Sequence, residues 1–134
     1  MRLAGSLALQ SAVYALLDGD ASVGALTGGA IYEAPPAGPV PDLYVSLGEE
    51  SVRDRSSVSG AGTRHDMTIS VVSGSGGFVR AKEVAAAVTG ALDGARPDLS
   101  EGRVTALRFI KSRAVRRGET RRMDLTFRAL WDED

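Results

Sequence analysis

The sequence predicts an α+β fold, an antiparallel sheet of about four strands with two helices packed on one face, in the order α-β-β-α-β-β. Two segments repeat apolar residues with the period of a helix, and the segments expected to be strands alternate apolar and polar residues. Helices and sheets of this kind bury their apolar sides most economically against each other. With 134 residues, residues 1–134 are expected to form a single domain.

The first helix is expected in the N-terminal part, because apolar residues recur with helical spacing between residues 3 and 17. Ser6 is expected to be its N-cap, and Asp18-Gly19-Asp20 to end it. Asp20 is then expected to cap a short turn, which is followed by an extended piece at residues 30–32. Four prolines between residues 35 and 41 exclude helix and central strand, so this stretch is predicted to be a surface connector.

Two strands are predicted next, over residues 43–52 and 64–72, each with its apolar side chains on one face. The polar stretch 53–63 between them is expected to be a long hairpin connection or a mobile loop. Loops of this length in compact domains are usually functional or disordered. A second helix is expected over residues 78–92, where the apolar positions form one stripe and Asp93-Gly94 follows as an end signal.

The last forty or so residues are predicted to form a β-hairpin, because apolar residues alternate on both sides of a polar, glycine-containing turn. With the turn at Arg117-Gly118, Val104 lies opposite Trp131 and Ile110 lies opposite Leu125. This pairing makes one face of the hairpin apolar. A slip of one residue would lose that face, so the parity of the register is well determined.

The same register produces one charge pair and two misfits. Lys111 lies opposite Asp124, which is favourable, whereas Arg108 falls on the apolar face and Arg113 faces Arg122. Like charges directly opposite each other destabilise a lone monomer. The two misfits would be explained if a partner supplied carboxylates.

Composition excludes several classes of site. The chain has no cysteine and one histidine, His65, which excludes disulfides, iron–sulfur clusters and thiolate zinc sites. A zinc or iron site built almost wholly from carboxylates would be unusual. We therefore expect no metal and no cofactor. No segment approaches the roughly 20 apolar residues of a membrane span, and a net charge of −1 gives no overall attraction to nucleic acid.

The sequence also contains no arrangement of residues that is typical of a catalytic site. A Ser-His-Asp triad would have to use His65 as its base. His65 and Asp66 are neighbours on a predicted strand, so their side chains point to opposite faces. The same holds for Glu49 and Glu50, which makes them a poor acid–base pair. We expect no catalytic residue and no enzymatic activity.

The candidate contact residues are charged side chains in two places, the 53–63 loop and the tip of the last hairpin. They are Arg53, Arg55, Arg113, Arg116, Arg117, Glu119, Arg121 and Arg122. Three interpretations stay open: contact with DNA phosphates, a solvated tip, or a protein interface. In the last case the arginines would meet acidic groups of a neighbour, such as Asp132-Glu133-Asp134 or Glu49-Glu50.

Several segments, taken together, are similar to one known family. They are Ala30-Ile31-Tyr32-Glu33-Ala34-Pro35, Pro41-Asp42-Leu43-Tyr44-Val45-Ser46-Leu47-Gly48-Glu49, His65-Asp66-Met67-Thr68-Ile69-Ser70-Val71, Ala81-Lys82-Glu83-Val84-Ala85-Ala86-Ala87-Val88, Leu107-Arg108-Phe109 and Thr120-Arg121-Arg122-Met123-Asp124-Leu125-Thr126-Phe127-Arg128-Ala129-Leu130. With the amphipathic N-terminal helix, they resemble the tail terminator (tail completion) proteins of long-tailed phages, in the branch found in gene transfer agents. The resemblance covers nearly the whole chain. Leu43 and Val72 depart from the family, which often has proline and tryptophan at these positions.

The resemblance implies a structural virion protein rather than an enzyme. Such proteins form a homo-oligomer, expected to be a hexameric ring, that caps the tail tube protein's finished tube and ends its polymerisation. The ring joins the tail to the head–tail connector or stopper protein, and DNA transits its lumen without specific binding. The expected location is the neck of the virion at the head–tail junction, after assembly in the host cytoplasm and with no membrane partner. The candidate residues above would then be subunit or partner contacts.

Two alternatives remain open. Another neck protein, an adaptor or a stopper, would share the ring but bind on the portal side. A small nucleic-acid-binding protein would instead use the basic hairpin 108–122, and salt-dependent DNA binding would support that interpretation.

Overall fold

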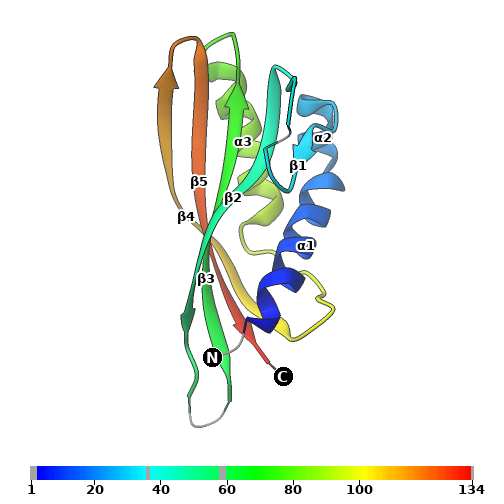
Figure 1. Cartoon of the computed structure of the whole chain (residues 1–134). Coiled ribbons are helices and arrows are strands. Elements are labelled where there is room, and N and C mark those ends of the chain that lie inside the picture. The colour runs from blue at the N-terminus through cyan, green and yellow to red at the C-terminus, as the bar shows by residue number, and fades with distance from the viewer. Residues whose placement is uncertain (1–2, 36, 58–59, 134) are drawn as a thin grey trace.

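A computed structural model describes residues 3–35, 37–57 and 60–133. In chain order the elements are α1 (Ala4–Asp18), α2 (Ala21–Thr27), β1 (Ile31–Tyr32), β2 (Leu43–Asp54), β3 (Gly62–Ser73), α3 (Phe78–Leu92), β4 (Arg103–Arg117) and β5 (Thr120–Asp132). The predicted α+β class is confirmed (Figure 1). The number and order of elements were wrong, because these ranges contain three helices and five strands in the order α-α-β-β-β-α-β-β.

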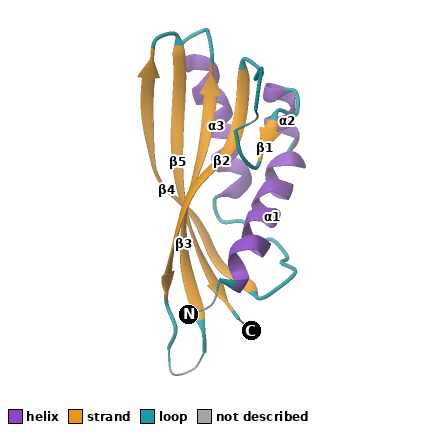
Figure 2. Ribbon diagram, in the orientation of Figure 1, coloured by secondary structure: helices purple, strands orange, loops and turns teal. Residues whose placement is uncertain are grey.

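The sheet is mixed, with the strand order β1-β2-β3-β5-β4 (Figure 2). All neighbouring strands are antiparallel except β1, which runs parallel to β2 and pairs Ile31 with Val45. The prediction of a purely antiparallel sheet missed this strand. Parallel pairing requires a crossover that returns the chain to the same end of the sheet. The proline-rich connection, exposed at its described residues, provides that return without a helix.

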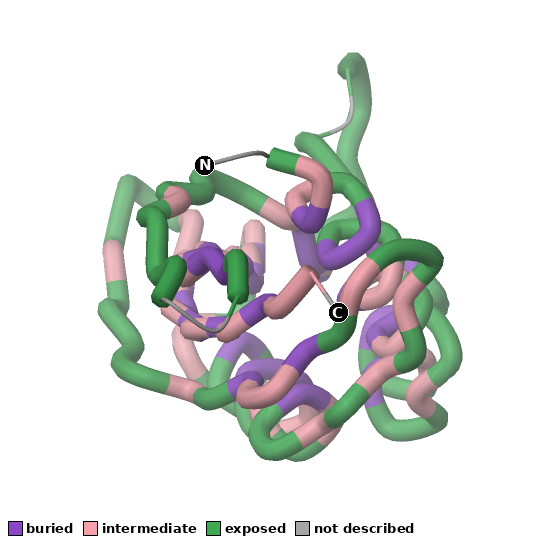
Figure 3. The backbone as a smooth tube through the Cα atoms, turned by 90° about the horizontal axis from the view of Figure 1, so that it is seen from below, coloured by how far each residue is buried: buried purple, intermediate pink, exposed green. Residues whose placement is uncertain are grey.

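The helices cover one face of the sheet, and the core lies between the two layers (Figure 1). Helix α3 has the predicted bounds of 78–92. Strand β5 shows the alternation most clearly, with buried Met123, Leu125, Phe127, Ala129 and Trp131. Buried positions gather at the centre of the molecule in Figure 3, whereas most connections are exposed. The intervening residues of the sheet form a polar face that no helix covers.

The start of the chain differs from the prediction in its cap. Helix α1 begins at Ala4 with Leu3 as the N-cap, and no side chain makes a capping hydrogen bond. Ser6 is therefore inside the helix, and the prediction that it caps α1 was wrong. Asp20 is confirmed as a cap, because its carboxylate accepts a hydrogen bond from the backbone N–H of Val23 at 3.0 Å. The predicted short turn after Asp20 is the helix α2.

Strands β2 and β3 are longer than predicted and contain an irregularity. The register shifts between Leu47 and Glu50, where two residues of β2 lie opposite one of β3, as in a β-bulge. Beyond the bulge Glu50 lies on the helix-covered side, beside Ser6 of α1. The predicted loop 53–63 shortens to residues 55–61, since its ends belong to the strands. Its residues Val58 and Ser59 lie outside the described residues, as do Met1, Arg2, Pro36 and Asp134.

The β4–β5 hairpin follows the predicted register only at its base. Val104 pairs with Trp131 as predicted, but Leu125 lies opposite Ser112 rather than Ile110. The turn is Gly118-Glu119, one residue later than predicted. Two register shifts, between Val104 and Ala106 and between Phe109 and Lys111, absorb the difference along the strand. Bulges of this kind leave little trace in an alternation pattern.

These shifts also change the charge pairs of the hairpin. Arg113 lies opposite Asp124, not Arg122, and the predicted pair of Lys111 with Asp124 was wrong. Arg108 is exposed and lies opposite Arg128 rather than on the apolar face. The predicted clash between Arg113 and Arg122 therefore gives no argument for a partner at that position.

Candidate interface surfaces

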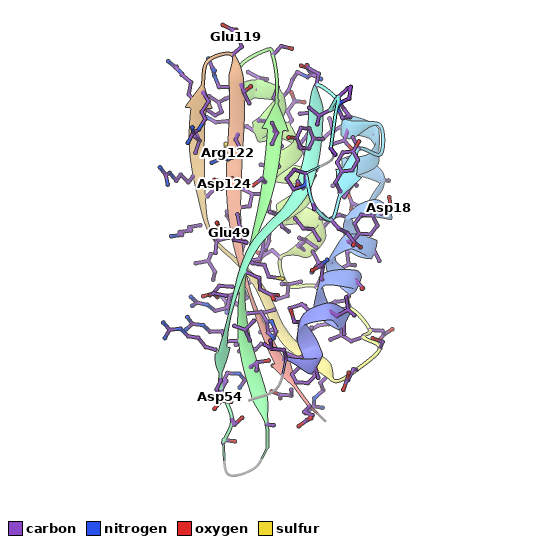
Figure 4. The ribbon with its side chains drawn as sticks, viewed as in Figure 1. Asp18, Glu49, Asp54, Glu119, Arg122 and Asp124 are labelled. Carbon is purple, nitrogen blue, oxygen red and sulfur yellow. The ribbon has the colours of Figure 1, made fainter. Side chains whose placement is uncertain are left out.

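The predicted contact residues form two separate groups at opposite ends of the sheet. Figure 4 places Asp54 near the β2–β3 connection and Glu119 at the β4–β5 turn, at the other end of the molecule. Arg53 and Arg55 adjoin Asp54, whereas the other five arginines and Glu119 lie along the hairpin near the β4–β5 turn. The eight residues cannot make up one continuous contact site.

At the β2–β3 end, one of the two candidate arginines already has a partner within the chain. The guanidinium of Arg55 forms an ion pair with the carboxylate of Asp132 at the end of β5. Arg53 is exposed and lies opposite Arg64 of β3. Of this group, Arg53 is the side chain that remains available to a partner.

Two arginines near the β4–β5 turn are also used inside the chain. Arg121 donates a hydrogen bond to the carbonyl oxygen of Gly118 at 2.7 Å, and its guanidinium lies 5.6 Å from the centre of the Phe78 ring. Arg122 donates to the carboxylate of Asp124 at 2.9 Å. The remaining candidates at this end, Arg113, Arg116, Arg117 and Glu119, are exposed. They form the outward-facing part of this group.

The face of the sheet that no helix covers contains ion pairs between neighbouring strands. Asp66 of β3 accepts hydrogen bonds from Arg128 at 2.8 Å and from Arg64 at 3.2 Å. The hydrogen bond from Arg128 holds the pKa of Asp66 below its usual range, and the charge of Arg64 acts in the same direction. Asp66 therefore offsets part of the positive charge that Arg64 and Arg128 bring to the middle of the open face.

A shallow hollow of about 420 Å³ lies on the same face, open to solvent. Its walls include Tyr44 and Glu49 of β2, Ser70 of β3, and Arg122 and Asp124 of β5. Ser70 donates a hydrogen bond to Asp124 at 2.8 Å, so one carboxylate of the hollow is already satisfied. The sequence analysis did not assign Asp124 or Ser70 to a site. The alternation of residues within β3 and within β5 could have indicated that Ser70 and Asp124 both lie on the polar face, but not that the two strands are neighbours.

His65 belongs to a buried polar network that the sequence analysis also missed. Its Nε2 forms a hydrogen bond with the hydroxyl of Thr63 at 2.8 Å, and its Nδ1 forms one with the carboxylate of Glu50 at 3.4 Å. Sequence neighbours were correctly excluded as partners, but the β2–β3 pairing supplies Glu50 from another strand. Thr63 and His65 are 3% and 0% exposed. The network therefore satisfies buried polar groups beneath α1 and does not present a nucleophile to solvent.

Glu50 is ionised more readily than an ordinary glutamate. Burial raises its pKa, but hydrogen bonds from His65 and Ser6 outweigh this effect and the pKa lies below its ordinary value. Within residues 3–35, 37–57 and 60–133, no cluster of three or more His, Asp or Glu side chains is arranged to bind a metal ion. The helices in this part of the chain are all too short or too polar to span a membrane.

The molecule described so far is a small α+β domain with exposed charged side chains at the edge and the two ends of its sheet. Residues 11–132 match the family described as "Tail completion protein gp17". The chain belongs to this family of structural proteins of phage-like virions.

A solved structure supports the same assignment. The chain is similar to one in the structure titled "Virion of native gene transfer agent (GTA) particle", with 47% identity and a TM-score of 0.91. The match covers 98% of this chain and 99% of that chain. A comparison with curated protein sequences gives no match. The resemblance found in the sequence is confirmed by both the family and the solved virion chain.

Proposed function

We propose that this chain assembles into a ring, most simply a hexamer, that caps the finished tail tube and ends its polymerisation. The observation that carries the proposal is the match, at 47% identity over 98% of the chain, to a component of a gene transfer agent virion. Membership in the tail completion family indicates the tail end of the particle as the place of action. A role in structure rather than catalysis fits both comparisons.

The surface of the subunit suits such an assembly. Strand β4 forms one edge of the sheet, paired on one side only. Exposed Arg113, Arg116, Arg117 and Glu119 at this edge and its turn are the proposed subunit contacts. A contact between two different surfaces of the same chain closes into a ring when its rotation allows.

The two faces of the ring would meet different partners. One face binds the tail tube protein and the other binds the head–tail connector or stopper protein, so the ring sits at the neck of the virion. DNA passes through the lumen without specific binding, since strong phosphate contacts would hold it there. The hairpin end with Arg53 extends beyond the helical layer in Figure 1 and is the proposed contact with one of these partners. Assembly takes place in the host cytoplasm, before the tail joins the head.

Tube growth provides the direct test. Tail tube protein is polymerised alone and with increasing amounts of this protein, and tube lengths and ends are measured by negative-stain electron microscopy. The proposal expects shorter tubes that carry an extra density at one end. Tubes of unchanged length with bare ends, at an excess of the protein, would overturn it.

The double charge reversal Arg116→Glu/Arg117→Glu tests the subunit contacts in the same assay. Both side chains are exposed, so the variant is expected to fold but to cap tubes poorly. Arg96→Glu, a reversal at an exposed position in the α3–β4 connection, serves as the control. Normal capping by the double variant would remove these arginines from the interface.

A further inference from the structure

Charge is distributed very unevenly between the two sides of the molecule. Strand β4 contains six basic residues, namely Arg103, Arg108, Lys111, Arg113, Arg116 and Arg117, and no acidic residue. Residues 3–42, which form α1, α2, β1 and the connection to β2, contain four acidic residues and no basic residue. The strand order puts β4 and β1 at opposite edges of the sheet. A chain with a net charge of −1 therefore has one basic and one acidic side.

The basic side chains of β4 are left without an ion pair, although Arg103 and Arg113 lie opposite Asp132 and Asp124 of β5. Arg55, Arg64, Arg80, Arg122 and Arg128 all form ion pairs within the chain. By contrast, none of the six basic side chains of β4 forms an ion pair with the residues that the structure describes. A row of cations without ion pairs repels another positive surface and attracts a surface that carries carboxylates.

The acidic side keeps two carboxylates free for such a contact. Asp20 caps α2, and Asp42 accepts a hydrogen bond from Arg80 at 2.6 Å. Asp18 and Glu33 are exposed and form no ion pair with any residue in the described ranges. Figure 4 shows Asp18 on the side of the molecule that lies away from β4.

The same charges determine which kind of contact the β4 edge allows. A bare edge strand is a template for pairing with another chain, and two β4 edges would pair around a twofold axis. Such a dimer would bring the six cations of each copy together, which like-charge repulsion opposes. The contact between the β4 edge and the acidic side of a second copy is favoured instead, because it joins opposite charges. A pair formed in this way still has one unbound β4 edge and one unbound acidic side, so further copies can add by the same contact.

We propose that the basic β4 edge of one copy binds the acidic side of the next copy, with Arg113 and Arg116 near Asp18 and Glu33. The contact is head-to-tail, so each copy uses one basic and one acidic side. This inference rests on the proposed ring, and it adds which surfaces meet and in which order. The charges that favour the head-to-tail contact disfavour a symmetric β4–β4 dimer.

A charge-swap experiment tests the contact with two complementary variants. The first, Arg113→Glu/Arg116→Glu, makes the β4 edge more acidic, and the second, Asp18→Arg/Glu33→Arg, makes the acidic side basic. Arg96→Glu is the control, because it reverses an exposed cation in the α3–β4 connection, outside β4 and outside residues 3–42. Circular dichroism establishes that each variant is folded. Self-association is then measured by sedimentation velocity over a concentration series at low and high salt.

Each edge variant alone is expected to self-associate at least about tenfold more weakly than the wild type. An equal mixture of the two variants is expected to restore association, because the acidic β4 edge of one now meets the basic side of the other. The control is expected to match the wild type, and salt is expected to weaken every restored contact. Folded variants that associate like the wild type, or a mixture that fails to associate, would overturn the inference.

Capping of tail tubes separates this inference from the proposed function. If both edge variants cap tubes as well as the wild type, the inference fails while the proposed function stands. If the mixture restores association but no sample caps tubes, the inference stands and the proposed function fails. A wild type that neither associates nor caps overturns both.

Salt-sensitive binding of duplex DNA that is lost in the β4 variant, with self-association unchanged, would assign the β4 edge to DNA and overturn the inference.

Discussion

Ser6 and Glu50, which lie 44 positions apart in the sequence, are joined by a hydrogen bond of 2.6 Å between the Ser6 hydroxyl and the Glu50 carboxylate. The bond fastens the first turn of α1 to β2. The other oxygen of the same carboxylate accepts from His65 at 3.4 Å. The β-bulge next to Glu50 puts its side chain on the helix-covered side, so the irregularity in β2 and the anchoring of α1 are one feature.

The Glu50 anchor predicts a dependence of stability on pH. Because the pKa of Glu50 in the folded protein lies below its ordinary value of 4.5, its contribution is fully present above that value. It is lost as the pH falls through the lowered pKa. Glu50→Gln is expected to cost about 1 kcal/mol at neutral pH and to show a shallower loss of stability on acidification. Urea denaturation at several pH values measures the difference, and parallel wild-type and variant curves would contradict it.

Trp131 provides a second prediction through the two glycines that it contacts. A Cβ added at Gly5 would lie 2.5 Å from Trp131 Cδ2, and one added at Gly102 would also collide with the indole. Gly102→Ala therefore suffers both a steric clash and a φ of +68°, whereas Gly94→Ala meets a similar φ of +80° with no atom within 4 Å. We expect Gly94→Ala to cost about 1–2 kcal/mol and Gly102→Ala about 1–3 kcal/mol more.

The comparison is made by urea denaturation followed by the fluorescence of Trp131, which is the chain's one tryptophan. Equal losses in free energy of unfolding for the two variants would show that Trp131 tolerates the added methyl group. The Gly94 variant controls for backbone strain alone.

The open face of the sheet gives a third prediction, centred on Asp66. Removing its charge with Asp66→Asn leaves Arg64 and Arg128 without their shared carboxylate, and Arg108 lies opposite Arg128. Because these side chains are partly exposed, the expected cost is about 0.5–1 kcal/mol and decreases with added salt. Asp98→Asn, at an exposed position with no ion pair in the described part of the chain, is expected to be neutral. A loss that is independent of salt would point to packing rather than charge.

Periodicity predicted the parts of the fold that depend on local sequence. The bounds of α3, the Asp20 cap and the buried faces of β3 and β5 all follow from helical spacing, capping chemistry and alternation. The missed features depend on contacts between distant segments. Strand β1 has two residues, too few for any pattern, and its identity as a strand depends on β2. The Glu50–His65 network likewise exists only because a bulge changes the side to which Glu50 points.

The candidate residues show the same division. Sequence composition located the arginines of the last hairpin, but it could not separate those with an internal partner from those without one. Arg55 and Arg122 bind carboxylates of their own chain, whereas Arg113 and Arg116 do not. This difference is set by strand register and by which strands are neighbours, which single-sequence patterns do not determine.

The bulges of β4 give the last prediction, because they reverse the burial expected for two apolar residues of this strand, Leu107 and Ile110. Uninterrupted alternation puts Ile110 in the core and Leu107 outside it, but Ile110 is 41% exposed and Leu107 is 1% exposed. Leu107→Ala is expected to lower the free energy of unfolding by about 2–4 kcal/mol, since it leaves a cavity. Ile110→Ala is expected to cost less, about 1 kcal/mol, because its side chain is already partly exposed to water. Both values are measured by urea denaturation under the same conditions, and the reverse order would mean that β4 is regular and that its cations face other directions than those described.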